Sequence, residues 1–215
     1  MVATFLRARE PCIFGVMADA ARSAVLVFRT EHAHVFAGLW RRLGEFDLVD
    51  AALADAYLAA QAAWPATGVP QNPASWMATV AMSATTSVLA KRGADLGEPA
   101  SPADEVRALL FGVCHPRLAP EERVVCLARA AVGLVPHEIA ALLGAPEATV
   151  TARLTSAKKT MRQPGAGFAP VADADRSARE ALVHATIAEL KRQAQGEDAA
   201  TVSAVLAARV SQAFG

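Results

Sequence analysis

Apolar residues recur at the spacing of helix turns along most of this chain, and much of its apolar content is alanine. Alanine is the best helix former, and a recurrence every three to four residues places side chains on one face of a helix. Aromatic residues, which favour strands, make up only 6% of the chain. The pattern therefore predicts an all-α fold.

Glycine and proline divide this pattern into segments. The predicted helices span residues 25–43, 46–64, 74–92, 104–114, 119–132, 136–143, 147–162, 173–195 and 198–214. We expect five parts in chain order: an N-terminal segment (1–22), a first small helical domain (23–92), a linker (93–103), a second small helical domain (104–168) and a tail that forms a helical hairpin (169–215).

The cysteine content and hydropathy predict a cytoplasmic protein that does not contact a membrane. Cys12, Cys114 and Cys126 are widely spaced and cannot all pair within one chain, which fits a reducing compartment. The first residues lack the apolar run of a signal peptide, and no stretch of about 18 residues has the character of a membrane span.

Residues 134–162 have the pattern of a helix-turn-helix. Gly144 falls at the tight turn, where a positive φ is often required. Val150, Leu154 and Met161 share one face of the second helix, while residues 147–163 carry four bases and one acid. This charge suits a helix that enters the major groove. A helical hairpin whose solvated face is basic is the alternative.

Two longer blocks resemble a known family. Residues 40–81 contain GEFDL and the pattern W-P-x-x-G-V-P-x-N-P-x-x-W, and residues 111–162 contain C-H-P-x-L-A-P. These blocks resemble the second and fourth conserved regions of extracytoplasmic-function sigma factors of the sigma-70 family. Their wording is similar to the subgroup that usually carries a C-terminal helical-repeat extension.

The resemblance implies a protein that binds core RNA polymerase and directs it to promoter DNA, with no catalytic residue and no cofactor. The polymerase-facing helix would be 47–60, with acids at Asp47, Asp50 and Asp55. A solvated helix face is the alternative for these acids.

The helix 147–162 would read the upstream promoter element. Base-edge contacts are expected from one set of polar residues and phosphate contacts from another. The first set is Thr149, Arg153 and Ser156; the second is Lys158, Lys159 and Arg162, to which Lys91 and Arg92 are added from the first domain.

The chain also departs from this family. Residues 81–92 (AMSATTSVLAKR) stand where members usually carry several Arg, Asn and Asp residues that touch promoter DNA, and only Lys91 and Arg92 remain. Residues 23–92 hold five bases and five acids, so they supply no net attraction for phosphates. Residues 169–215 stand in place of the long extension.

These departures support a second hypothesis, a repurposed sigma-like regulator that binds polymerase, a sigma factor or DNA without autonomous promoter melting. The net charge of zero suits a protein brought to DNA by a larger partner. An anti-sigma or other regulatory protein is a further candidate partner. The tail would act as an internal brake if it covered residues 147–162.

An enzyme is the rival from another class. The sequence has no G-x-S-x-G, P-loop or dinucleotide fingerprint. His32 and His34 lie on different faces of one helix, and the adjacent Cys114 and His115 are poorly spaced for one metal ion. We therefore expect neither catalysis nor a metal site.

Overall fold

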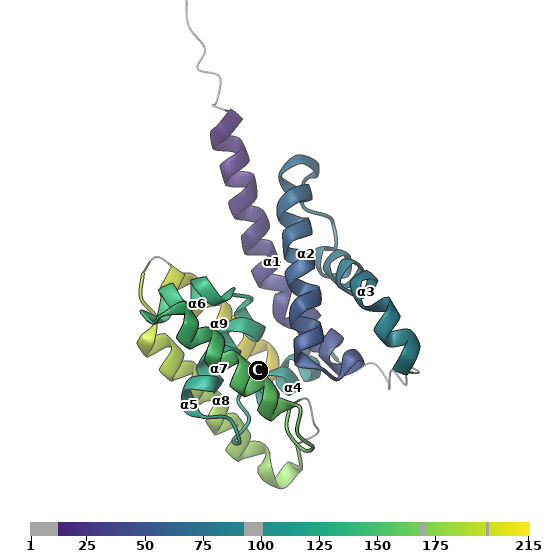
Figure 1. Ribbon diagram of the computed structural model, residues 1–215. Helices are drawn as coiled ribbons and strands as arrows, with labels where there is room; N and C mark the ends of the chain where they lie inside the picture. The colour runs from purple at the N-terminus through teal and green to yellow at the C-terminus, as the bar shows by residue number, and fades with distance from the viewer. Residues whose placement is uncertain (1–12, 93–100, 168–170, 197) are drawn as a thin grey trace, which may run out of the picture.

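The computed structural model describes residues 13–92, 101–167, 171–196 and 198–215, and all regular structure within these ranges is helical (Figure 1). The predicted all-α class is confirmed. In chain order the elements are α1 (Ile13–Leu43), α2 (Phe46–Thr67), α3 (Pro73–Arg92), α4 (Pro102–Val113), α5 (Pro120–Leu127), a π-helical turn η1 (Ala128–Val132), α6 (Pro136–Leu143), α7 (Glu147–Met161), α8 (Asp173–Gln193) and α9 (Asp198–Phe214).

Most predicted helix bounds lie within three residues of the observed ones, and α1 is the exception. This helix begins at Ile13, so it includes residues 13–22, where the sequence shows no helical pattern. Residues 1–12 and most of the predicted linker lie outside the described residues. None of the helices in the described ranges is long and apolar enough to cross a membrane.

The first three helices pack together around aromatic side chains. Gly44 ends α1 with a φ of 70°, and the chain turns directly into α2. Trp40 lies edge-on to Phe46, with 5.2 Å between ring centroids. Trp64 and Trp76 make a similar contact between α2 and α3. Trp40 and Trp64 are almost fully buried, so they have the core-packing role that their size favours.

The helix-turn-helix forms where the sequence predicts it. Gly144 ends α6 in the left-handed conformation, with φ 59° and ψ 34°. After this turn α7 packs on α5 and α6 through Val150, Leu154, Ala157 and Met161, all of which are buried. The predicted inward face of this helix is therefore correct.

The tail helices belong to the core of the molecule. α8 packs on α4, α5 and α6, and α9 packs on α4, η1 and α1. The backbone N–H of Gln195 donates to the Leu142 carbonyl at 2.8 Å, and the Arg107 side chain donates to the Ala213 carbonyl at 2.7 Å. The outer residues of α7, among them Thr155 and Ser156, remain exposed. The tail therefore supports the helix-turn-helix from behind and leaves its outer face open.

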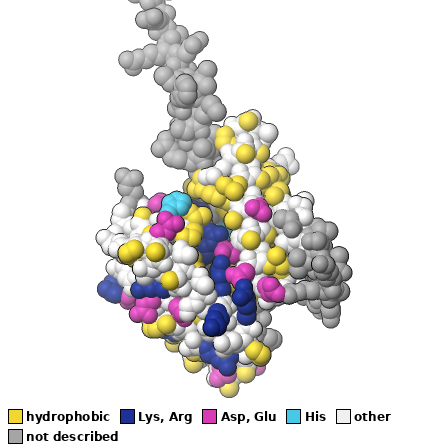
Figure 2. All heavy atoms as spheres, in the orientation of Figure 1, with side chains coloured by type: hydrophobic (Ala, Val, Ile, Leu, Met, Phe, Trp, Pro, Cys, Tyr) yellow, Lys and Arg dark blue, Asp and Glu magenta, His cyan; other side chains and the backbone are white. Residues whose placement is uncertain are grey.

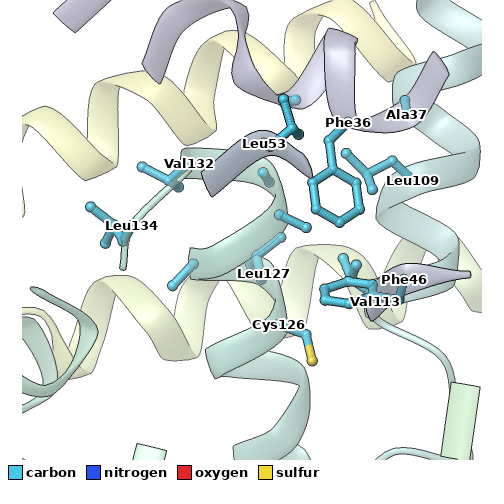
Figure 3. Packing of buried hydrophobic residues seen from close by; sticks show 14 of the residues in the cluster. Phe36, Ala37, Phe46, Leu53, Leu109, Val113, Cys126, Leu127, Val132 and Leu134 are labelled. Carbon is cyan, nitrogen blue, oxygen red and sulfur yellow. The ribbon is translucent and has the colours of Figure 1, made fainter. Parts of the chain in front are cut away.

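One hydrophobic core joins the two predicted domains. The C-terminal half of α1 contacts α2 and α3 on one side and α4 and η1 on the other. In Figure 3, Phe36 of α1 and Phe46 of α2 point toward Leu109 of α4 and Leu127 of α5. All four side chains are buried. This shared core places α7 beside α2.

Candidate functional site

The outer face of α7 carries the residues predicted to contact DNA. Ser156, Lys159 and Arg162 are exposed, whereas Thr149 and Arg153 are half-buried. The helix has 15 residues, a length of roughly 22 Å. Its N-terminal half presents mainly small or hydroxyl-bearing side chains to solvent, and the bases gather toward its C-terminal end.

That C-terminal end meets the start of α2. Asp50 accepts hydrogen bonds from Arg129 Nε at 2.5 Å and from Lys158 Nζ at 2.9 Å. Asp47 lies 3.2 Å from Lys158 Nζ and also pairs with the Arg162 guanidinium. We call these five residues the charged seam. In Figure 2, Lys and Arg side chains alternate with Asp and Glu side chains along the line where α7 meets α2.

Burial makes the inner half of the charged seam the stronger half. Burial alone would raise the pKa of Asp50, but the positive charges of Arg129 and Lys158 outweigh it and hold that pKa below its ordinary value. Arg129 is 6% exposed and also donates to the Leu134 carbonyl at 3.0 Å. Removing one partner from such a buried pair typically costs about 3–5 kcal/mol, because the other charge is left uncompensated.

The outer half of the charged seam is weaker. The Arg162 side chain is 61% exposed, so water screens its pairing with Asp47. Lys158 is intermediate, since its side chain is 22% exposed and its ammonium lies 5.8 Å from the centroid of the Phe46 ring. The seam can therefore open from the Arg162 end more easily than from the Arg129 end.

The structure thus pairs residues that the sequence assigns to two different partners. Asp47 and Asp50, predicted to face polymerase, are bound to Lys158 and Arg162, predicted to face DNA phosphates. Asp55 is exposed on α2 and has no role in the seam. Lys91 and Arg92 are the last two residues of α3, and their side chains lie outside the described residues.

Sequence reasoning missed Arg129. A signal was available, because Arg129 is the only acidic or basic side chain between Val124 and Pro136 in an otherwise apolar run. A charge in such a run is rarely buried without a partner. The partner itself is not readable from the run, since Asp50 lies 79 residues earlier in the chain.

The two described cysteines, which are candidate nucleophiles, are buried. Burial raises the pKa of the Cys114 thiol to about 12 and also raises that of Cys126, so both thiols are protonated at neutral pH and poorly nucleophilic. Among the described residues, no three or more His, Cys, Asp or Glu side chains are grouped so that they could hold a metal ion.

No family model and no solved structure matches the chain. Among curated proteins it is similar to an uncharacterized protein of Rhizobium meliloti (strain 1021), with 25% identity over 166 residues. The match covers 67% of this chain and 39% of the relative, so the chain spans about two-fifths of the length of that protein. This similarity carries no activity with it.

Proposed function

We propose that this chain is a sigma-like transcription protein that binds duplex DNA through α7 and core RNA polymerase through α2. Its resting form is the closed form, in which the ion pairs of the charged seam are made. The observation that carries the proposal is the charged seam. Acids on α2 and bases on α7, which the sequence assigns to two separate macromolecules, neutralise each other within one molecule.

The helix-turn-helix geometry supports DNA binding. A left-handed Gly144 sets the angle between α6 and α7, and the tail helices leave the outer face of α7 uncovered. Lys159 is exposed and stands outside the charged seam, so it can contact a phosphate in the closed form. Lys158 and Arg162 would add their charges only after leaving Asp47 and Asp50. The protein should therefore bind DNA weakly while the ion pairs of the charged seam are made, and more tightly once Lys158 and Arg162 have left them.

The first test is DNA binding by anisotropy of a labelled duplex pool at several salt concentrations. We expect Lys159→Glu to weaken binding and to reduce the dependence of log Kd on log salt by about one phosphate contact. Lys191→Glu makes the same charge change on the exposed face of α8, away from α7, and is the matched control. Equal effects of the two variants would contradict a role for α7.

A second candidate function is regulation without promoter melting, and α3 favours it. In its described part the exposed side chains include Ser75, Thr79 and Ser83, and none of these carries a charge. The hydroxyls of Thr79 and Ser83 donate to carbonyls of their own helix, at 2.8 Å and 2.7 Å. A surface that captures separated DNA strands needs positive charge and stacking groups. The exposed side chains of this part of α3 carry hydroxyl groups and no positive charge.

Polymerase binding and initiation can be separated in two assays. Retention on immobilised core RNA polymerase tests the α2 surface. The double variant Lys158→Gln and Arg162→Gln should raise retention, because it frees Asp47 and part of the Asp50 charge. Lys159→Gln is the control.

Abortive initiation on promoter DNA then distinguishes the two candidate functions. Product formation supports ordinary sigma activity, and retention without product supports the regulator.

A further inference from the structure

A polar cavity of about 290 Å³ lies on the C-terminal half of α1, between the start of α3 and the start of α4. Both of these helices pack on α1, so three elements of the shared core form its walls. The volume is close to the lower end of the range that small-molecule sites occupy. Because α2 and α7 contribute none of the lining residues, this cavity is separate from the proposed DNA and polymerase contacts.

Glu105 is the buried acid of the cavity. Its side chain is held on one side only, since Oε1 accepts hydrogen bonds from Arg41 Nε at 3.1 Å and from Arg41 Nη2 at 2.9 Å. Among the described residues no donor reaches Oε2, and Nδ1 of His34 stands 4.0 Å from it, beyond hydrogen-bond distance. Nδ1 of His34 is fully enclosed, whereas Oε2 keeps accessible surface. One oxygen of a buried carboxylate is therefore left for a donor that enters the cavity.

The backbone beneath this carboxyl group is a glycine. Gly38 lies within α1, where glycine costs about 1 kcal/mol relative to alanine. A Cβ at this position would lie 3.4 Å from Oε2 of Glu105, so the missing side chain leaves that oxygen uncovered on the α1 side. Gly38 and Glu105 both line the cavity, and the free oxygen therefore faces it.

Arg42 supplies an opposite charge in the same cavity. It is exposed, and it makes no ion pair or hydrogen bond with another residue in the part of the chain that the structure describes. It follows Gly38 by one helical turn, a rise of about 6 Å along α1. A ligand that reaches both Arg42 and the free oxygen of Glu105 needs an anionic group and a donor only a few bonds apart.

The balance of charge narrows the class of ligand. Arg41 and Arg42 bring two positive charges to the cavity and Glu105 brings one negative charge, which leaves an excess of one positive charge when histidine is counted as neutral. This excess disfavours a simple cation and favours a ligand whose net charge is negative. An ammonium group donates to a carboxylate, and a carboxylate pairs with a guanidinium through charge-assisted hydrogen bonds. An α-amino acid with an acidic side chain has both groups and a net negative charge.

We infer that this cavity binds a free α-amino acid with an acidic side chain, whose ammonium group donates to Oε2 of Glu105 and whose α-carboxylate pairs with Arg42. The α3 wall offers the Ser75 hydroxyl and the Asn72 amide as donors for the side-chain carboxylate. Asn72 already caps α3 by accepting from the Ser75 backbone N–H through Oδ1, at 2.9 Å, so its Nδ2 is the donor that remains. The inference does not depend on DNA or polymerase binding.

The probe is L-glutamate, titrated into the full chain at neutral pH and followed by amide chemical shifts, with sodium chloride at equal ionic strength as the blank. It should bind with a Kd of roughly 0.1–1 mM, the range expected for a molecule of this size. L-Glutamine lacks the side-chain charge and glutarate lacks the ammonium group, so each should bind at least about threefold more weakly.

Three results would count against the inference. Absence of saturable binding by glutamate overturns it entirely. Glutarate that binds as tightly as glutamate overturns the contact between the ammonium group and Glu105, because any small dianion would then suffice. Glutamine that binds as tightly as glutamate overturns the preference for an acidic side chain.

Two pairs of variants assign the binding to this cavity. Arg42→Gln should weaken glutamate binding about tenfold, whereas Arg176→Gln, at an exposed position of α8, should leave it unchanged. Ser75→Trp places a large side chain on the α3 wall and should abolish binding, and Ser177→Trp on the exposed face of α8 is its control. Unaltered binding by Ser75→Trp overturns the site, and unaltered affinity in Arg42→Gln overturns the carboxylate contact.

Discussion

Arg129 and His32 are two buried polar side chains in different electrostatic surroundings. Arg129 is held in an apolar region by a carboxylate on one side and a backbone carbonyl on the other, so its charge is compensated. His32 is also buried, and desolvation keeps its ring neutral. The two residues stand close to each other, and the positive charge of the first adds to the burial that keeps the second uncharged.

We expect the titration of His32 to lower the free energy of unfolding in mild acid. Its folded pKa is about 3 and its unfolded value is about 6.5, so below pH 6.5 only the unfolded chain takes up the proton. The stabilising contribution is complete above pH 6.5 and is lost as the pH falls toward 3. Between pH 7.5 and pH 5 we expect this residue to remove about 2 kcal/mol from the free energy of unfolding.

Urea unfolding at the two pH values measures this loss. His32→Phe should remove most of it, and His184→Phe, at an exposed position, should not. An acid dependence that survives His32→Phe in full would contradict the assignment.

Gly144 lies in the turn of the helix-turn-helix, in a backbone conformation that would strain most residues with a side chain. With φ at 59°, Gly144→Ala places an L side chain in the left-handed region and should lower the free energy of unfolding by about 1–2 kcal/mol. Gly144→Asn should cost less, because asparagine tolerates this conformation. Urea denaturation of both variants gives the comparison, and an alanine variant as stable as the wild type would refute the prediction.

At the scale of elements, α9 is a structural support of the helix-turn-helix domain. Leu206 is fully buried, and Arg209 donates hydrogen bonds to the carbonyls of Arg29 and Thr30 in α1. α9 therefore binds the end of the chain to its first described helix. The sequence-based idea that the tail covers α7 as a brake finds no support in this packing, because the tail lies on α4, α5, α6, η1 and α1.

The variant Leu206→Ala distinguishes a structural role of α9 from inhibition of DNA binding by the tail. It should cost about 2–5 kcal/mol in the free energy of unfolding, as for other large-to-small changes in a core. DNA affinity, measured on folded protein below the unfolding transition, should stay the same. Ala208→Ser, on the exposed side of α9, should change neither quantity. A rise in DNA affinity with Leu206→Ala would instead support the hypothesis that the tail inhibits DNA binding.

The elements themselves could be predicted because their signals are local. Gly44 and Gly144 mark helix ends through backbone conformations that glycine adopts freely, and Pro136 starts α6 at its first turn. The missed part of α1 lacks such a signal. Residues 13–22 (IFGVMADAAR) form a helix that has no clear apolar stripe, and the side chains of the first 12 residues of α1 lie outside the described ones.

The candidate site could be predicted only in part, because its contacts are not local. The faces of α2 and α7 follow from helical periodicity, and both were assigned from the sequence. That Asp47 meets Arg162 depends on a fold that joins positions 115 residues apart. Periodicity places a residue on a helix face but does not determine which element covers that face, so acids and bases assigned to different partners were not expected to pair.

At the scale of the whole molecule, the two halves of the protein share one core and are joined at its edge by ion pairs. The core is continuous from α1 to α9, so full separation of the halves would expose a large apolar area. Opening at the outer half of the charged seam requires much less, since Arg162 is already largely in water. We therefore expect a limited movement of α7 against α2 to precede tight DNA binding.

We propose that the acids of α2 hold the bases of α7 away from DNA. The most direct test is the DNA affinity of Asp47→Asn combined with Asp50→Asn. The charge-matched control is Asp55→Asn combined with Glu121→Gln, which removes two exposed acids that lie outside the charged seam. Freeing Lys158 and Arg162 should tighten binding of a labelled duplex roughly tenfold, equivalent to about 1.4 kcal/mol, and the control should change it far less. Equal affinities for the two folded double variants would contradict the account.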